Sequence, residues 1–420
     1  MKKFDVVITA YGLVSPLGHS IESFQTGLFS GKSGVKSIRG TMVAEDFPVP
    51  YAACVDRQSL PKTKYFENQD NQTIMKSWLM TAVATESVLE KAKLTEKHPI
   101  DAIIYGTADG VSFEQVAEVL KEKKQSVFIE SKFDFKRTRC ESSLDVINDI
   151  LQNSGMPEVP GEQRICINSA CATGNNVLGI AFEGIQMGRW DRCIVGGVDA
   201  RCEPSNFLNF HYLGALTTAN VPPEEASRPF SVDRSGFVRG EGAAVLVVES
   251  RESALARGAK ILCRVTGYGF TSDAFRLTDG RDDGSSVVKA MDLAIKSAEL
   301  KPQDINYINA HGTSTPLNDR LESIAIKKVF GEYACRTPIS SLKSQIGHST
   351  IASSALEAIA CVLMLQNQKI APTLNYKAGD PDCDLDYVPE GTRELTLTNI
   401  MSNSFGFGGQ NSCIVFTKES

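Results

Sequence analysis

One segment near the middle of the chain limits what the rest can fold into. Ile165 to Ile167 form a short apolar run, small residues follow from Ser169 to Gly174, and residues 175–187 are small or apolar on nearly every side. The run predicts a buried strand, and the small residues predict a sharp turn. A helix without a polar face has to be buried. We therefore expect a strand, a turn and a helix in the protein interior.

This turn carries Cys171. A thiol at the start of a helix lies near free backbone N–H groups and the positive end of the helix dipole, which favour the thiolate, the nucleophilic form of cysteine. The opposite interpretation is that Cys171 is one of the buried, unreactive cysteines that are common in protein cores. The chain has eleven cysteines, so the local sequence leaves both interpretations open.

The composition narrows the possible classes of protein. A chain of 420 residues is long enough for two domains or one large duplicated domain. Its cysteines are odd in number and show neither a CxxC pair nor zinc-ligand spacing, which indicates a reducing, cytoplasmic location without disulfides or a metal site. The net charge of −6 gives no reason to expect nucleic acid. No segment approaches the roughly 20 apolar residues that cross a membrane.

The hydrophobic pattern alternates between strands and helices, which is typical of an α/β fold. Residues 30–73 are irregular and are expected to form surface loops. Of two basic clusters, 121–124 is interpreted as a solvated face, and 136–139 could contact an acidic partner. The expected strands are 4–9, 102–105, 192–199, 243–248, 265–270 and 305–309, and the other expected helices are 21–29, 75–93, 250–257 and 352–365.

The second half of the chain repeats the plan of the first. Residues 305–315, a strand that runs into a turn of small residues, resemble residues 102–109. Residues 341–350 lead into an apolar helix as residues 169–174 do. We therefore predict a duplicated fold with a pseudo-twofold axis, divided into residues 1–255 and 256–420. The first half carries Cys171.

Two of the five histidines stand out by their surroundings. His311 and His348 lie in glycine-flanked turns next to regular elements, where a core-filling role would be unusual. Lys343 precedes His348 by five residues and could orient a carboxylate or set the charge state of the imidazole. His19 and His98 have polar neighbours and are interpreted as surface residues.

Four ordered motifs carry a resemblance to a known family. They are Ser169-Ala-Cys-Ala-Thr-Gly174, Asn309-Ala-His-Gly-Thr-Ser-Thr-Pro316, Lys343 to His348, and Asn403-Ser-Phe-Gly-Phe-Gly-Gly409, supported by Arg228-Pro-Phe and Gly236-Phe-Val-Arg-Gly-Glu-Gly242. With them the chain resembles the β-ketoacyl-acyl carrier protein synthases of types I and II, condensing enzymes of the thiolase-like superfamily. The resemblance implies a duplicated αβαβα layered fold with two mixed sheets around buried helices.

The resemblance also implies a reaction. Cys171 would accept an acyl group from a carrier thioester, and His311 and His348 would stabilise the enolate that forms when a malonyl thioester loses CO2. The product would be β-ketoacyl-acyl carrier protein, in fatty-acid or specialised polyketide or polyene synthesis. No bound cofactor is implied, because the phosphopantetheine arm of acyl carrier protein carries the substrates. The implied partners are acyl carrier protein and a second synthase subunit, in a homodimer or a heterodimer.

Other motif residues acquire roles by the same resemblance. Lys343 would support the two histidines. The backbone N–H groups of Cys171 and Phe407 would form the oxyanion hole, and Phe407 would be the gate to the acyl pocket, on a glycine-rich loop suited to movement. Thr313 and Thr315 would bind the phosphopantetheine arm.

Two acidic residues and one departure complete the comparison of motifs. Asp319 and Glu322 match supporting acidic residues eight and eleven positions after the first histidine. Ser349-Thr-Ile-Ala-Ser-Ser354 replaces the glycine- and alanine-rich turn that usually follows the second histidine.

Other classes of protein compete with this interpretation. Chain-length factors lack the nucleophilic cysteine, so Cys171 argues against that class. A thiolase would have a second reactive cysteine where Gly406 to Gly409 stand, and the type III synthases have asparagine where His348 stands. A Cys-His hydrolase would need a group that activates water. The alternative left open is a ketosynthase subunit that is active only as a heterodimer with a chain-length-factor-like partner.

Overall fold

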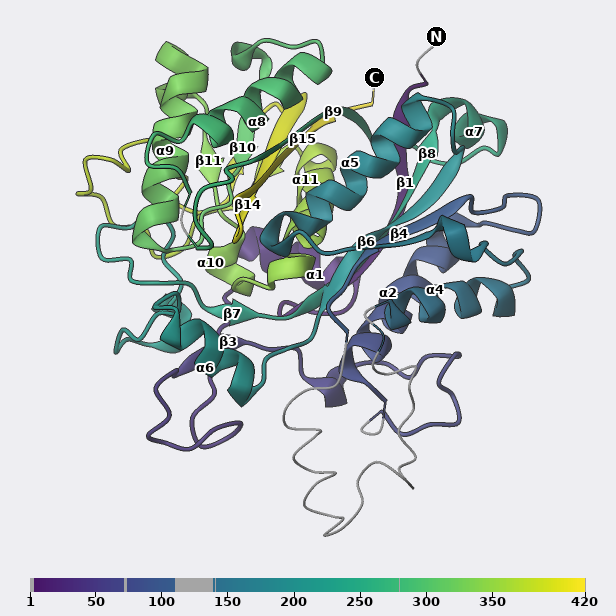
Figure 1. Ribbon diagram of the computed structural model, residues 1–420, viewed down its shortest axis with the longest axis horizontal. Helices are drawn as coiled ribbons and strands as arrows, with labels where there is room; N and C mark the ends of the chain where they lie inside the picture. Colours follow the sequence, from purple (N-terminus) through teal and green to yellow (C-terminus); the bar gives the residue numbers. More distant parts are fainter. Residues whose placement is uncertain (1–3, 72–73, 110–138, 140, 279, 420) are drawn as a thin grey trace.

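The structure is a computed structural model that describes residues 4–71, 74–109, 139, 141–278 and 280–419 (Figure 1). The basic cluster at 121–124, and 136–138 of the second cluster, lie outside the described residues. The expected alternation of strands and helices is confirmed, with small differences at the element ends. The first strand, for example, extends to Val14 instead of ending at residue 9.

A ten-stranded mixed sheet organises the fold, and its two halves have the same plan. In each half two parallel pairings are followed by two antiparallel ones. The first half contains, in order, β5 (Arg164–Ile167), β4 (Ala102–Gly106), β6 (Arg192–Asp199), β8 (Gly242–Ser250) and β1 (Val6–Val14). The second contains β11 (Ile339–Ser340), β10 (Tyr307–Asn309), β14 (Asn399–Gly406), β15 (Gln410–Thr417) and β9 (Cys263–Ser272). This repetition is the expected duplication.

The two halves are joined, and the expectation of two separate sheets is corrected in this detail. Val6 to Ile8 of β1 pair antiparallel with Cys263 to Val265 of β9. Each of these strands is the last of its half, so this short pairing makes one continuous sheet. β5 lies at one end of that sheet and is therefore only half-buried, whereas its apolar sequence predicts full burial.

Two apolar helices lie in the interior, between the halves of the sheet. α5 (Thr173–Gln186) and α11 (Ser353–Asn367) follow β5 and β11 and pack against each other. They contribute to one apolar cluster together with β1, β8, β14 and β15. The stretch Thr350–Asn367 is long and apolar enough to cross a membrane, but 89% of it is buried inside the fold, which is the position of a core helix.

Pairs of helices cover the outer faces and complete five layers (Figure 1). α2 (Lys76–Ala92) and α4 (Ser142–Asn153) cover the first half of the sheet, with α2 on β1 and β8. α8 (Ser285–Ser297) and α9 (Pro316–Phe330) cover the second half, with α8 on β9 and β15. The thiolase-like fold class is thereby confirmed.

The segment expected to be only surface loops contains part of a small second sheet. β3 (Tyr51–Ala53) is buried and pairs with β2 (Lys36–Ser37) and with β7 (Arg239–Gly240). The strands are too short to leave a periodic pattern. The remaining helices and strands are α1 (Ile21–Ser30), α6 (Pro204–Tyr212), α7 (Arg251–Ala256), α10 (Lys343–Ile346), β12 (Lys369–Ile370) and β13 (Arg393–Glu394).

Candidate active site

Cys171 lies in a tight turn between β5 and α5. The turn is a 3-10 helix, Ala170–Ala172, and Ala170 has a left-handed backbone with φ 51°. The Thr173 hydroxyl accepts a hydrogen bond from the Ser169 backbone N–H at 2.9 Å and donates one to the Ala170 carbonyl at 2.7 Å. A left-handed non-glycine residue is a strained conformation that its surroundings must hold. The turn is therefore built to fix the direction of the thiol.

His348 contacts the sulfur directly. Its Nε2 lies 3.1 Å from Cys171 Sγ, and its Nδ1 lies 2.9 Å from the hydroxyl of Ser353 in the first turn of α11. Both polar partners and the imidazole are buried. A ring held at both nitrogens has a fixed orientation, so it can receive the thiol proton without moving.

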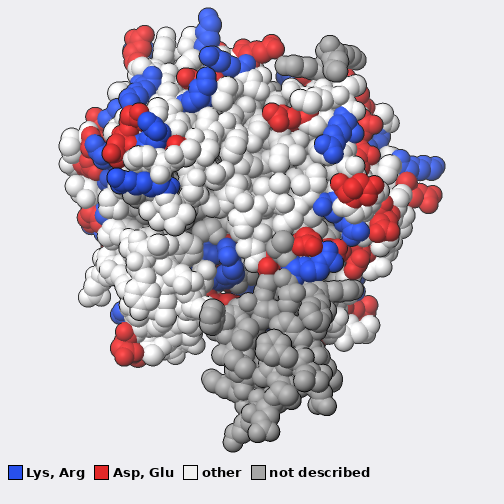
Figure 2. All heavy atoms as spheres, viewed as in Figure 1, with Lys and Arg blue, Asp and Glu red and all other residues white. Residues whose placement is uncertain are grey.

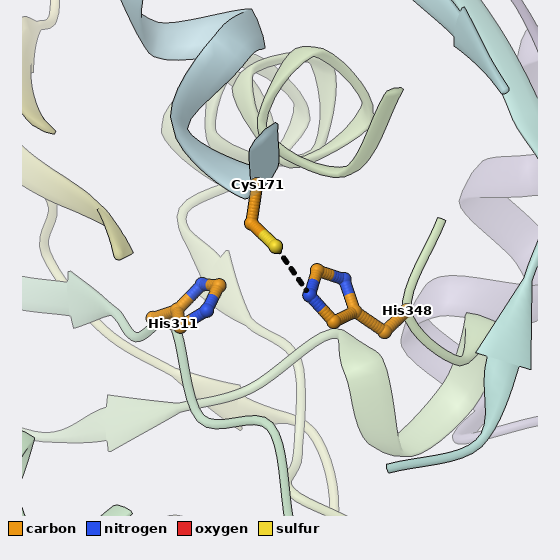
Figure 3. Close-up of side chains that lie close together, drawn as sticks. All are labelled: Cys171, His311 and His348. Atoms are coloured by element: carbon orange, nitrogen blue, oxygen red, sulfur yellow. Dashed lines mark hydrogen bonds between the residues drawn. The ribbon is translucent and has the colours of Figure 1, made fainter. Parts of the chain in front are cut away.

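His311 approaches from the turn after β10. Its ring centroid is 5.4 Å from that of His348, with the two planes 82° apart. Its Nδ1 is buried and has no hydrogen-bond partner among the described residues. One donor atom each of Cys171, His311 and His348 lie within 4.8 Å of one another. Figure 3 shows the two imidazoles arriving from separate segments on the side to which the thiol points.

Burial favours the neutral form of all three groups and opposes the effect expected of the helix start. Burial raises the pKa of the Cys171 thiol to about 11, although the Lys343 ammonium and a hydrogen bond from the Phe407 backbone act in the opposite direction. Burial and then the charge of Lys343 hold the pKa of both imidazoles well below the ordinary value. For the pKa of Cys171, the loss of hydration on burial has a larger effect than the helix start.

Lys343 supplies a buried positive charge beside the histidines, as the resemblance implies. Its Nζ is 2.5 Å from Glu357 Oε1 on α11, and each side chain is 1% exposed. Burial raises the pKa of Glu357, and the lysine opposes that rise. Glu357 was missed by sequence reasoning, although a single carboxylate inside an apolar helix is a signal that could have found it.

Asp319 and Glu322 hold the turn that carries His311. Glu322 accepts the backbone N–H groups of His311 and Gly312 at 2.9 and 2.8 Å. Asp319 accepts those of Thr313 and Phe230 at 2.9 and 2.7 Å, among others. Burial raises the pKa of both carboxyls, that of Glu322 to about 7. Their contacts are therefore those of supporting residues.

Most of the predicted site residues line one cavity of about 280 Å³. The Thr313 and Thr315 hydroxyls, 2.8 Å apart, lie in its wall. Phe407, in the turn between β14 and β15, stacks on Phe210 with centroids 6.1 Å apart. The cavity lining includes Cys171, His311, His348, Thr313, Thr315, Glu322 and Phe407, whereas Lys343 and Asp319 stand behind it.

Close backbone packing brings the Phe407 turn to the nucleophile. A Cβ on Gly406 would lie 2.9 Å from the Cys171 backbone nitrogen, so the glycine permits the approach. The Phe407 backbone N–H reaches the Cys171 thiol as a hydrogen-bond donor, and a donor at that place can stabilise a negative oxygen formed there.

Within the described part of the chain, two groups of side chains have a spacing that could hold a metal ion. One is the Cys171, His311 and His348 group, with a donor set that suits zinc. The other is Cys54, Cys202 and Glu241, but there the carboxylate already binds Lys76 at 2.5 Å and the backbone N–H groups of Val55 and Cys202.

Comparison with known proteins identifies the family. Residues 160–254 match the model of the beta-ketoacyl synthase N-terminal domain, and residues 262–377 match that of the C-terminal domain. The chain is 35% identical over 422 residues to a 3-oxoacyl-acyl-carrier-protein synthase 2 of Synechocystis sp., which covers 100% of this chain and 99% of that protein.

Solved structures agree with the sequence comparison. A type II polyketide ketosynthase, bound to the hexaketide and in complex with its acyl-carrier protein, has a TM-score of 0.86 and 32% identity, covering 99% of this chain and 100% of that one. The ishigamide ketosynthase/chain length factor has the same TM-score and identity and covers 100% of both chains. The resemblance is confirmed: the chain belongs to the β-ketoacyl synthase family of condensing acyltransferases.

Proposed function

We propose that this chain catalyses the decarboxylative Claisen condensation of a Cys171-bound acyl group with malonyl-acyl carrier protein, in fatty-acid or specialised polyketide synthesis. The observation that carries the proposal is the meeting of Cys171, His311 and His348 at one cavity. A nucleophile beside one imidazole, with a second imidazole free to donate, is what acyl transfer followed by decarboxylation requires.

In the first step Cys171 is acylated. The neutral thiol gives its proton to Nε2 of His348, 3.1 Å away, and the sulfur attacks the carrier thioester. The backbone N–H groups of Cys171 and Phe407 stabilise the resulting oxyanion. The intermediate collapses, the carrier thiolate leaves, and it recovers the proton from His348.

In the second step a malonyl thioester occupies the cavity. His311 and His348 donate N–H hydrogen bonds to its thioester oxygen, which carries the negative charge of the enolate once CO2 leaves. Neutral imidazoles retain one N–H each, so the depressed histidine pKa values are compatible with this role. For this step His348 carries its proton on Nε2, and its Nδ1 accepts from the Ser353 hydroxyl, whereas in the first step the proton is on Nδ1. The enolate carbon attacks the acyl-Cys171 carbonyl, the cysteine sulfur leaves as a thiolate, and a proton from solvent restores the neutral thiol.

The cavity wall supports delivery of substrates on a long arm. Thr313 and Thr315 present hydroxyls that can hydrogen-bond the amides of phosphopantetheine. Phe407 is the gate between this arm and the acyl group. The reaction needs no bound cofactor or metal, because the carrier arm supplies both acyl groups and the histidines handle charge and protons.

The partners we propose are acyl carrier protein and a second synthase subunit, in the cytoplasm. β5 is an edge strand with all four residues half-buried, and an open sheet edge is a natural pairing site. Figure 2 shows charged side chains mainly around the rim of one face and few near its centre. Similarity to a ketosynthase/chain length factor keeps the heterodimer as the second candidate.

One assay tests the condensation. The purified protein is incubated with acyl-acyl carrier protein and malonyl-acyl carrier protein, while acyl-Cys171 and β-ketoacyl product are followed by mass spectrometry. We expect both species with the wild type and with Cys335→Ala, which removes an exposed thiol, and neither with Cys171→Ala. A Cys171→Ala protein that condenses normally would refute the mechanism. Activity only after a second subunit is added would establish the heterodimer.

A further inference from the structure

A buried ion pair stands directly behind His348, and the mechanism above does not use it. Arg239 of β7 is fully buried, and its Nη2 donates to Asp199 Oδ1 at 2.7 Å, at the end of β6. Its Nε donates to Asn206 Oδ1 at 3.0 Å. A buried arginine is costly unless its donors are satisfied. Here they are satisfied by groups from three other segments, the end of β6, α6 and residues 348–350, and by the neighbouring Gly240 carbonyl.

One nitrogen of the Arg239 guanidinium binds the backbone of His348, a proposed catalytic residue. Arg239 Nη1 donates to the His348 carbonyl at 2.9 Å. The same carbonyl accepts the Gly240 N–H at 2.9 Å, and the His348 N–H donates to the Val238 carbonyl at 2.7 Å. Residues 238–240 thus bind both the N–H and the carbonyl of His348, and the Arg239 guanidinium adds a second hydrogen bond to that carbonyl.

A second contact reaches the strained residue before α11. Arg239 Nη1 lies 3.3 Å from the hydroxyl of Thr350, which also donates to Asp199. Thr350 has a left-handed φ of 36°, a conformation that costs energy in a β-branched residue and needs outside support. Thr350 begins the 3-10 turn that leads to Ser353, the partner of His348 Nδ1. The His348 backbone and the turn that carries Ser353 are therefore both held by the Arg239 guanidinium.

The network also contributes charge. The ionisable groups that face the His348 imidazole include two cations, and these lower its pKa together with burial, whereas Asp199 raises it. Arg239 is thus the second buried cation at the site. It comes from the first half of the chain, whereas Lys343 of α10 comes from the second. The full set is Cys171, His311, Lys343 with its partner Glu357, and Arg239 with its partner Asp199.

We propose that Arg239 is a positioning residue of this active site: anchored on Asp199, it fixes the His348 backbone and the Thr350 side chain, and so the contact between Nε2 and the Cys171 sulfur. The proposal rests on the proposed role of His348 as the proton acceptor. It assigns to the arginine of the Gly236 to Gly242 motif a purpose that the sequence alone did not provide.

Three variants separate geometry from charge. Arg239→Met removes the charge and the hydrogen bonds. Arg239→Lys keeps the charge but lacks the planar set of guanidinium donors, and Thr350→Val removes only a hydroxyl. Arg201→Met is the matched control, because Arg201 also binds Asp199, at 2.7 Å, and makes no hydrogen bond to His348 or Thr350. The acyl probe is acyl-acyl carrier protein, with transfer to Cys171 followed by mass. Cys171 alkylation by iodoacetamide is measured in parallel and needs no carrier.

We expect Arg239→Met to lower kcat for acylation by about 100-fold, with KM within about twofold, because a misplaced base slows the step without changing carrier binding. In the pH profile of the Arg239→Met acylation rate, the acid limb should move to higher pH, since loss of a cation raises the pKa of His348. Arg239→Lys should recover part of kcat and keep the wild-type acid limb. Thr350→Val should lose about 2- to 10-fold, the effect of one hydrogen bond, and Arg201→Met should remain within about threefold.

Circular dichroism and thermal unfolding establish that each variant is folded. A folded Arg239→Met with the wild-type kcat and pH profile would overturn the proposal, as would variants that lose thermal stability without any change in kcat. If Arg239→Met does not fold, Arg239→Lys and Thr350→Val provide the test. An unchanged kcat in both variants would then refute the positioning role of Arg239. A wild type that alkylates at Cys171 but accepts no acyl group would instead refute the proposed function, and the alkylation rates would still report the positioning effect.

Discussion

Cys171 Sγ and His348 Nε2 lie 3.1 Å apart, and burial favours the neutral form of both groups. A buried thiol with a pKa of about 11 is a poor nucleophile until its proton is removed. The imidazole is available as that acceptor because it is itself neutral. Burial thus prevents a permanently reactive thiolate and makes nucleophilicity depend on correct placement of the histidine.

The ion pair behind the histidines gives a prediction on stability. Lys343→Met would leave Glu357 buried without its cation, and breaking a buried pair in this way costs about 3–5 kcal/mol. The double variant Lys343→Met, Glu357→Met should be much less destabilised, because neither charge remains. Lys369→Met, which removes an exposed pair with Glu394, should cost less than about 1 kcal/mol. Guanidinium unfolding measures all three, and a single variant no less stable than the double would contradict this account.

At the scale of elements, the crossing of α5 and α11 positions the nucleophile. Gly174, in the first turn of α5, meets α11 so closely that a Cβ would lie 2.3 Å from the backbone nitrogen of Ala355. The Asn175 N–H donates to the Ser354 hydroxyl at 3.1 Å across the same contact. Each helix is entered through a left-handed residue, Ala170 and Thr350. The pseudo-twofold repeat therefore extends to the turn that bears the thiol, where Ile351 takes the place of Cys171.

This packing predicts the result of a single methyl group. Gly174→Ala should force α5 and α11 apart, destabilise the fold by about 1–3 kcal/mol or more, and slow acylation of Cys171, three residues away. Gly161→Ala is the control, because its nearest neighbour would be an arginine side chain 3.8 Å away, and it should remain within about 0.5 kcal/mol of the wild type. Chemical unfolding and acyl transfer are measured on both. Equal effects of the two substitutions would rule out the close contact.

Sequence patterns predicted these elements where the information is local. An apolar helix after a small-residue turn is recognisable at α5 and again at α11, because periodicity and turn chemistry act over a few residues. The pairing of Arg239 with Asp199 joins positions 40 residues apart and depends on two-residue β7, which has no period to detect. The three reacting side chains were predicted by their motifs, but burial, and with it the neutral thiol, exists only after the layers assemble.

At the scale of the whole molecule, the duplicated halves share one core. α5 from the first half and α11 from the second belong to the same apolar cluster, with Leu178, Leu246, Ile359 and Ile414 among its members. The halves are also joined by the pairing of β1 with β9. Each half also has an apolar cluster beneath its own outer helices. Independent domains have few contacts across their boundary, whereas here the central cluster crosses it.

The shared core predicts how the molecule unfolds. The full chain should show one cooperative transition in calorimetry, because separating the halves would expose the apolar surface of both central helices. Fragments 1–255 and 256–420, divided where the sequence suggests, should each lack a cooperative transition alone and regain native circular dichroism when mixed. A fragment 1–255 that melts cooperatively by itself would show that its part of the sheet and the helices packed on it are sufficient. Cys171 and His348 would then be brought together by docking of two folded domains, whereas a common core requires that the site and the fold form in the same step.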